Sequence, residues 1–171
     1  MAYIPAHSHP WRPAVDWPDP PGEVERALAA ERRLAAMLAQ HGYILLYDGV
    51  CGLCNRLVQF VLKRDTIGTM RFATLQGELG KAALRQLPEI ADVDSVILLH
   101  REGAWVRSTA ALEVARYLGG RWSATLAAYA VPRIMRDWVY DFIAKRRYRW
   151  FGQHADCPVP ASEVKDRFLD P

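Results

Sequence analysis

The residues with the clearest chemical potential are Cys51 and Cys54, two of the three cysteines in this chain of 171 residues. They lie in the stretch YILLYDGVCGLCNRLVQFVLKRD (residues 43–65), where an apolar run typical of a buried strand is followed by an apolar pattern typical of a helix. Two thiols at C-x-x-C spacing can exchange disulfides, and the same spacing supplies half of a zinc site. The choice between these chemistries depends on the elements that hold the two sulfurs.

The pattern around the pair predicts a strand over residues 43–47 and an amphipathic helix over residues 55–64, with Cys54 in line with its apolar face. Cys51 then falls in the first turn of the helix, where unpaired backbone N–H groups and the helix dipole favour an anionic sulfur. Because the thiolate is the nucleophilic form, we expect an exposed Cys51 to attack a disulfide. A more buried Cys54 would then resolve the mixed disulfide.

Asp48 stands at the end of the predicted strand, directly before the motif. If it is buried near Cys54, its pKa would be raised, and it could take or relay the proton of the resolving thiol. In a purely structural role, its carboxylate would instead accept backbone N–H bonds within the turn at residues 48–51. Both interpretations are compatible with the sequence.

The remaining pattern alternates helices and strands. Helices are predicted over residues 23–40, 78–87 and 108–118, and strands over 70–75, 95–100 and 104–107. Ser108 or Thr109 is the predicted N-cap of the third of these helices. A parallel strand pair joined by a helix and followed by an antiparallel hairpin predicts an α/β protein. Its small mixed sheet would be flanked by helices in a thioredoxin-like arrangement.

The segments on either side of this predicted core have different compositions. Residues 1–22 are rich in proline and predict an extended arm, whereas residues 121–130 and 132–149 predict two further helices, with Pro132 at a first helical position. We therefore divide the chain into residues 1–42 (arm and helix), residues 43–120 (thioredoxin-like core) and residues 121–171, a C-terminal helical extension packed on the same domain.

Two side-chain patterns stand out in the last predicted helix. Six apolar residues recur at helical spacing and are predicted to pack into the core: Ile134, Met135, Trp138, Val139, Phe142 and Ile143. Four cations follow, as is favourable at a helix C-terminus, or an anionic partner could bind them: Lys145, Arg146, Arg147 and Arg149.

Composition narrows the class of protein. Apolar residues make up 51% and charged residues 24%, which predicts a globular chain, and the net charge of +3 with no recognisable motif argues against nucleic acid as a partner. The N-terminus lacks the pattern of a secretory signal, and no apolar stretch is long enough to span a bilayer. We expect a cytoplasmic protein, in which close-spaced cysteines are catalytic or metal-binding rather than structural.

The third cysteine, Cys157, follows the last predicted helix together with His154. It could be a partly buried thiol, or an accessory resolving thiol if its segment returns to Cys51. It could also join Cys51, Cys54 and His154 in a four-ligand site of zinc type. His7 and His9, in the proline-rich arm, are expected to be bystanders.

The stretch YDGVCGLCNRLVQFVLKRD resembles the D-x-x-C-x-x-C signature of the DCC family of predicted thiol-disulfide oxidoreductases. Further matches are RFATLQ (71–76), SVILL (95–99), RSTAAL (107–112) and VPRIMRDWVYDFIAKRRYRWFG (131–152), followed by Cys157. The resemblance implies a thioredoxin-like fold and thiol-disulfide activity without a cofactor. It also implies site roles for Asp48, Cys51 and Cys54, and a protein or small molecule with a disulfide or thiol as the substrate.

The chain departs from the family pattern at several positions. Gly52 stands where the family often has proline, Ser108–Thr109–Ala110 replaces a serine–aspartate–alanine pattern, and Arg146 replaces an asparagine. Thioredoxins in general place a cis-proline before the third strand, where Ser95 stands in this chain. We therefore expect substrate to contact Gly52, Leu53 and Ser95 in a different way, and a metal could reach the thiolates more easily.

Three hypotheses follow from the sequence. The leading one is a thiol-disulfide oxidoreductase. The second is a metal-binding protein, and the third is a redox-silent interaction module that binds a partner through the basic last helix and the tryptophan-containing arm.

Overall fold

The computed structural model describes residues 3–5, 22–90, 96–152 and 162–170. Its centre is a five-stranded mixed sheet with the strand order β1-β5-β4-β2-β3. The strands are β1 (Tyr3–Pro5), β2 (Tyr43–Tyr47), β3 (Arg71–Thr74), β4 (Ile97–His100) and β5 (Gly103–Val106). Only the β2–β3 pair is parallel among the described strands, and the other three pairs are antiparallel.

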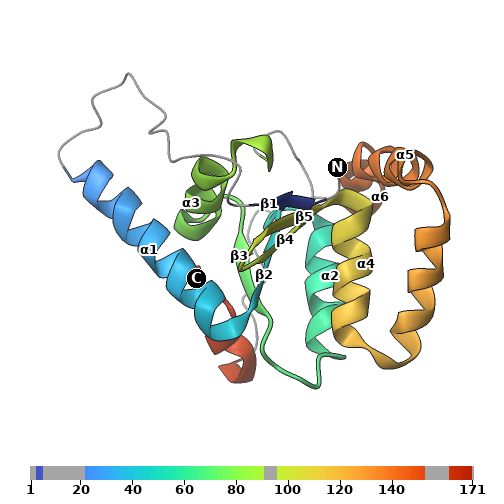
Figure 1. Ribbon diagram of the computed structural model, residues 1–171, viewed down its shortest axis with the longest axis horizontal. Coiled ribbons are helices and arrows are strands. Elements are labelled where there is room, and N and C mark those ends of the chain that lie inside the picture. The colour runs from blue at the N-terminus through green and yellow to red at the C-terminus, as the bar shows by residue number, and fades with distance from the viewer. Residues whose placement is uncertain (1–2, 6–21, 91–95, 153–161, 171) are drawn as a thin grey trace.

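Helices cover both faces of the sheet. Helices α1 and α3 lie on one face, and α2 and α4 lie on the other (Figure 1). The α-helices are α1 (Glu23–His41), α2 (Gly52–Leu62), α3 (Glu78–Gln86), α4 (Arg107–Leu118), α5 (Arg133–Ala144) and α6 (Arg147–Phe151). Three 3-10 helices complete the described elements: η2 (Pro88–Ile90), η3 (Gly120–Ala130) and η4 (Ser162–Arg167).

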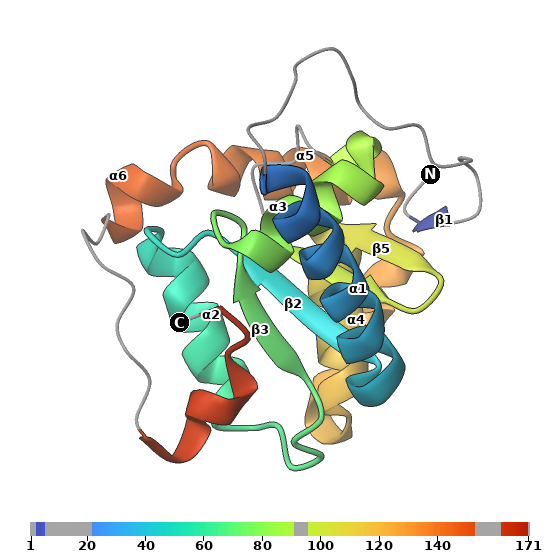
Figure 2. The same ribbon diagram turned by 90° about the vertical axis from the view of Figure 1, so that its left-hand side faces the viewer.

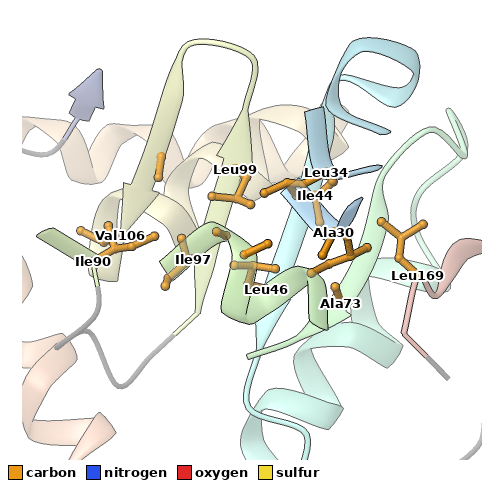
Figure 3. Packing of buried hydrophobic residues seen from close by; sticks show 14 residues of the cluster. Ala30, Leu34, Ile44, Leu46, Ala73, Ile90, Ile97, Leu99, Val106 and Leu169 are labelled. Atoms are coloured by element: carbon orange, nitrogen blue, oxygen red, sulfur yellow. The ribbon is translucent and has the colours of Figure 1, made fainter. Parts of the chain in front are cut away.

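The two faces of β2 point into two separate cores, because successive side chains of a strand alternate. Ile44 and Leu46 pack with Leu34 of α1 in the core beneath α1 and α3 (Figure 3). Leu45 and Tyr47 face the other way, into the core that contains both cysteines. Strand β2 is therefore buried between two layers of helices, and it leads directly to the cysteine pair.

The predicted fold class is confirmed. The sheet is mixed and flanked by helices, with a helix before it and further helices after it, consistent with a thioredoxin-like fold. The structure adds β1, within the predicted arm, as an antiparallel edge strand on β5. At the other edge, the C-terminal segment lies beside β3 (Figure 2), where Phe168 forms a bridge with Phe72.

Several predicted boundaries after β5 are wrong. Helix α4 begins at Arg107 with Val106 at the N-cap and no side-chain cap, so neither Ser108 nor Thr109 caps it. Residues 120–130 form a 3-10 helix, and Pro132 is the N-cap of α5 rather than its first residue. The predicted last helix is in fact two helices, α5 and α6, separated by a turn at Lys145 and Arg146, where the Arg146 N–H bonds to the carbonyl oxygen of Ile143.

The largest correction concerns the apolar stripe of α5. The stripe was predicted to pack into the core, but no residue of α5 is buried. Ile134 is 85% exposed and Trp138 is 69% exposed. Asp137 and Asp141 of α5 contact Ser108 and Arg107 at the start of α4. The apolar side of α5 is left accessible, and part of it lines a hollow beside α4. The spacing thus correctly predicted an amphipathic helix, but its apolar side is not buried in the core.

No helix in the described parts of the chain combines the length and the apolar character needed to cross a membrane.

Candidate active site

Cys51 occupies the N-cap of α2, one position before the first helical residue, and not the first turn as predicted. The backbone N–H of Cys54 donates a hydrogen bond of 3.4 Å to its sulfur. An N-cap side chain normally accepts this bond through oxygen, because the first N–H groups of a helix have no partner within it. The sequence therefore places a sulfur where a helix offers donors to an anion.

Both cysteines are free thiols and both are buried, which contradicts the prediction of an exposed Cys51. Cys51 is 0% exposed and Cys54 is 4% exposed. Helix α6 lies over the N-terminal end of α2 (Figure 2), and the N–H of Gly52 donates 3.2 Å to the carbonyl oxygen of Gly152. The C-terminal extension therefore covers the start of the cysteine motif.

The close approach of α6 explains the glycine between the cysteines. A Cβ atom at Gly52 would lie 2.2 Å from the carbonyl oxygen of Phe151, closer than any real contact allows. Proline, common at this position in the family that the sequence resembles, would both introduce this clash and remove the N–H that bonds Gly152. Gly52 is thus required by the packing of α6, whereas its predicted contact with substrate stays a prediction.

Replacing Gly52 with alanine is expected to push α6 away from α2. We expect a loss of about 1–3 kcal/mol in unfolding free energy, since the clash is with backbone, and faster alkylation of Cys51 by iodoacetamide under native conditions. Peptide mapping after timed alkylation measures this rate. Gly120→Ala is the control: a Cβ there meets nothing within 4 Å, but the left-handed φ of +55° strains any side chain. This variant should therefore also lose stability, yet alkylation of its Cys51 should not become faster. Equal alkylation of Cys51 in Gly52→Ala and the unchanged protein would show that α6 does not shield the sulfur.

Asp48 is buried beside the motif, and polar groups surround its carboxylate. Oδ1 accepts hydrogen bonds from the Val50 N–H at 3.2 Å and from Nε2 of Gln76 at 3.0 Å. Oδ2 forms an ion pair of 3.1 Å with Nη2 of Arg147 and accepts a short hydrogen bond from the Tyr148 hydroxyl. The bond from Val50 confirms the structural role predicted for Asp48 in its turn.

The structure contradicts the predicted direction of the Asp48 pKa. Burial by itself would raise this pKa, but the hydrogen bonds and the charge of Arg147 outweigh it, and the pKa of Asp48 lies below its usual value. The carboxylate is therefore ionised at neutral pH. A carboxylate held in this way is a poor acceptor for a thiol proton, so the direct proton-relay role loses its physical basis.

The pKa of the Cys54 thiol is shifted in the opposite direction from that of Asp48. Burial, together with the hydrogen bond and charge of Cys51, raises the pKa of Cys54 to about 12. A backbone hydrogen bond with Asp48 and the positive charge of Arg147 act against this rise. The charge of Arg147 thus favours the thiolate of Cys54.

Three partners of Asp48 were not singled out as site residues in the sequence: Gln76, Arg147 and Tyr148. Arg147 was predicted to be one of four cations at a helix end, yet its side chain is only 3% exposed. Nothing in a run of basic residues distinguishes the buried member from its exposed neighbours. The available signal was the position of all three residues within the segments that resemble the DCC family.

Of the other predicted site residues, some lie in the described part of the chain and others do not. Leu53 is half-buried in the first turn of α2. Ser95, His154 and Cys157 lie outside the described residues, as do His7 and His9, so the accessory-thiol and zinc interpretations stay predictions. Among the residues that are described, no three metal-ligating side chains gather into a group that could hold a metal ion.

Comparison with known proteins identifies the family of the chain. Residues 45–153 match the family described as DCC1-like thiol-disulfide oxidoreductase. The uncharacterized protein YuxK of Bacillus subtilis (strain 168) is 44% identical over 127 residues, which cover 74% of this chain and 93% of that protein. A chloroplastic DCC family protein of Arabidopsis thaliana is 35% identical over 119 residues, covering 68% of this chain and 69% of that protein. No solved structure matches. The chain belongs to the DCC1-like thiol-disulfide oxidoreductase family.

Proposed function

We propose that this protein catalyses thiol-disulfide exchange, with Cys51 as the nucleophile and Cys54 as the resolving thiol. The observation that supports the proposal best is the position of the Cys51 sulfur at the N-cap of α2, where it accepts the Cys54 N–H. Backbone donors and the positive end of the helix favour an anionic sulfur at this position, and the anion is the attacking species.

The proposed reaction takes place in two displacements. The Cys51 thiolate attacks one sulfur of a substrate disulfide, the S–S bond breaks, and the first substrate thiolate leaves and takes a proton from water. The Cys54 thiolate then attacks the Cys51 sulfur and expels the second substrate thiolate. The substrate gains two electrons and two protons, and the protein loses them as the Cys51–Cys54 disulfide forms.

Arg147 is the proposed positioning residue for the second displacement. Its charge is held against Asp48 by the 3.1 Å ion pair, and it favours the Cys54 thiolate. Asp48 in this account fixes Arg147 and the turn before Cys51, and does not itself carry the proton. Solvent that enters when the end of α6, at Phe151 and Gly152, moves away from Gly52 would take the proton from Cys54, while Arg147 at the start of α6 stays paired with Asp48.

Access of substrate requires such a movement, because Cys51 is fully buried. The contact between Gly52 and the end of α6 is a single backbone hydrogen bond with a tight backbone approach, so it can open without breaking the sheet. We propose a reducing cytoplasmic setting for this exchange, in which the pair rests as two thiols.

The second displacement should depend strongly on pH. In a mixed disulfide the charge of Cys51 is gone, but burial still holds the pKa of Cys54 above its usual range, so little thiolate exists at pH 7. We expect the resolution rate to rise about tenfold per pH unit from pH 6 to beyond pH 9, following the thiolate fraction. Stopped-flow release of the chromophore from a Cys51 mixed disulfide with the aromatic disulfide reagent DTNB measures this rate.

The matched control is Cys54→Ser carrying the same mixed disulfide. It should be stable until free cysteine is added, and resolution by that exposed thiol should level off near its own pKa of about 8.5. A rate in the unchanged protein that is constant with pH, or that levels off together with free cysteine, would contradict a buried resolving thiol. Release at the same rate from Cys54→Ser without added thiol would exclude Cys54 from the reaction.

A further inference from the structure

Helix α5 presents its apolar side outward. The exposed residues of this surface, which we call the α5 face, are Ile134, Met135, Trp138, Val139, Phe142 and Ile143. They follow one another at helical spacing on a helix that lies at the upper edge of the molecule, near the start of α4 (Figure 1). A contiguous apolar patch of this kind on a protein surface usually marks a binding site.

Aromatic rings continue the α5 face into α6. The ring of Trp138 stacks with that of Phe142 at 6.0 Å between centroids, and Phe142 contacts the exposed Trp150 edge-to-face at 5.9 Å. The guanidinium of Arg146 lies 3.8 Å from the centroid of Phe142. The row therefore combines two tryptophans with a cation that rests directly on an exposed aromatic ring.

The charges beside this row are positive. The two acidic residues of α5 are both paired with arginine, Asp137 with Arg133 at 3.1 Å and Asp141 with Arg107 at 3.6 Å. At the C-terminal end of the face, three cations are exposed to solvent: Lys145, Arg146 and Arg149. The surface thus presents apolar and aromatic groups bordered by cations, with its acidic groups neutralised.

We infer that the α5 face binds the surface of a membrane that contains anionic lipids, with α5 lying in the interface. An amphipathic helix with tryptophan and aliphatic residues on one side and cations beside them is the arrangement that binds such an interface. The cations complement anionic headgroups, which are concentrated on the cytoplasmic leaflet, and tryptophan is favoured at the level of the headgroups. This binding goes beyond the proposed thiol exchange and does not depend on it.

Vesicle sedimentation with the full chain tests the inference. We compare vesicles of phosphatidylcholine alone with vesicles of phosphatidylcholine and phosphatidylglycerol, and follow tryptophan emission in parallel. The expected result is binding to the anionic vesicles with a blue shift of the emission, and binding weakened by added salt. Absence of sedimentation with anionic vesicles, or equal binding to both vesicle types, would overturn the inference.

Two double variants separate the apolar and electrostatic contributions. Ile134→Glu with Trp138→Glu should abolish binding. Lys145→Glu with Arg146→Glu should lower the partition coefficient roughly 30-fold or more, since each cation near an anionic surface contributes about fivefold. Circular dichroism melting confirms that both variants fold, as expected for substitutions at exposed positions.

Matched charge changes elsewhere serve as controls. Ile67 is exposed and lies far from the α5 face in the sequence. Lys63, at the end of α2, and Lys81, in α3, are exposed cations. Ile67→Glu and the pair Lys63→Glu with Lys81→Glu should bind anionic vesicles like the unchanged protein. If these controls lose binding as strongly as the α5 variants, net charge and not the α5 face is responsible. If light scattering instead finds a dimer that Trp138→Glu dissociates, and no vesicle binding, the face is a self-association surface and the inference is wrong.

Discussion

Replacing Arg147 with methionine is expected to lower the free energy of unfolding by about 3–5 kcal/mol, because it leaves the Asp48 carboxylate buried without its ion-pair partner. Both side chains of the pair are 3% exposed, so water cannot take over the role of the guanidinium. The pair also joins α6 to the end of β2, and its loss removes a link that holds the extension over the cysteines. Urea denaturation at pH 7, followed by far-ultraviolet circular dichroism, measures the change.

A double-mutant cycle distinguishes a lost charge pair from a general packing defect. Asp48→Asn removes the charge at nearly constant volume, so Asp48→Asn combined with Arg147→Met should be clearly less destabilised than the sum of the two single variants. Arg85→Met is the surface control, since Arg85 pairs with Glu31 at 3.5 Å while 41% exposed, and it should cost no more than about 1 kcal/mol. Additive effects, or an Arg147→Met variant as stable as the unchanged protein, would show that the pair is not a stabilising link.

Replacing Cys51 with serine is expected to reduce disulfide reduction to the rate of the protein-free control. A serine hydroxyl at the N-cap of α2 can accept the Cys54 N–H as the sulfur does, so the fold should be retained. It cannot act as the leaving group or attacking group in exchange with a disulfide. Absorbance at single turnover, with DTNB as the oxidant and the dithiol protein as the reductant, measures the loss.

Cys54→Ser is the informative companion to this variant. It should release one equivalent of chromophore and then stop at the mixed disulfide, whereas the unchanged protein should release two. A Cys51→Ser variant that still releases two equivalents at the original rate would assign the nucleophilic role to another thiol. Cys157 would then be the residue to replace next.

The sheet and the cysteine motif could be predicted from the sequence because each depends on local patterns. The apolar run at residues 43–47 predicts β2, and the amphipathic pattern after Cys54 predicts α2. The glycine at position 42 predicts the end of α1. Positions governed by packing between distant segments were not accessible in this way. Gly52 is a glycine because Phe151 approaches it, and Arg147 is buried because Asp48 lies beneath α6.

The wrong prediction for α5 has a related cause. Hydrophobic periodicity shows that a helix has an apolar side, but the same pattern occurs whether that side meets a core or another surface. The cations Lys145 and Arg146 beside the stripe are consistent with an apolar side that meets another surface. They are equally consistent with a helix C-terminus, which is the position that the sequence predicts for them. Only the exposure of these side chains in the folded protein shows that the apolar side of α5 is not buried in the core.

The most direct test of thiol-disulfide exchange by Cys51 and Cys54 is to identify the disulfide that the protein forms when it reduces a substrate. The dithiol protein is mixed with one equivalent of DTNB, quenched in acid, alkylated and digested, and the linked peptides are identified by mass spectrometry. We expect two equivalents of released chromophore and a disulfide between Cys51 and Cys54 that dithiothreitol reduces. Release of chromophore with both of these cysteines still alkylated as free thiols, or with the bond formed through Cys157 instead, would contradict it.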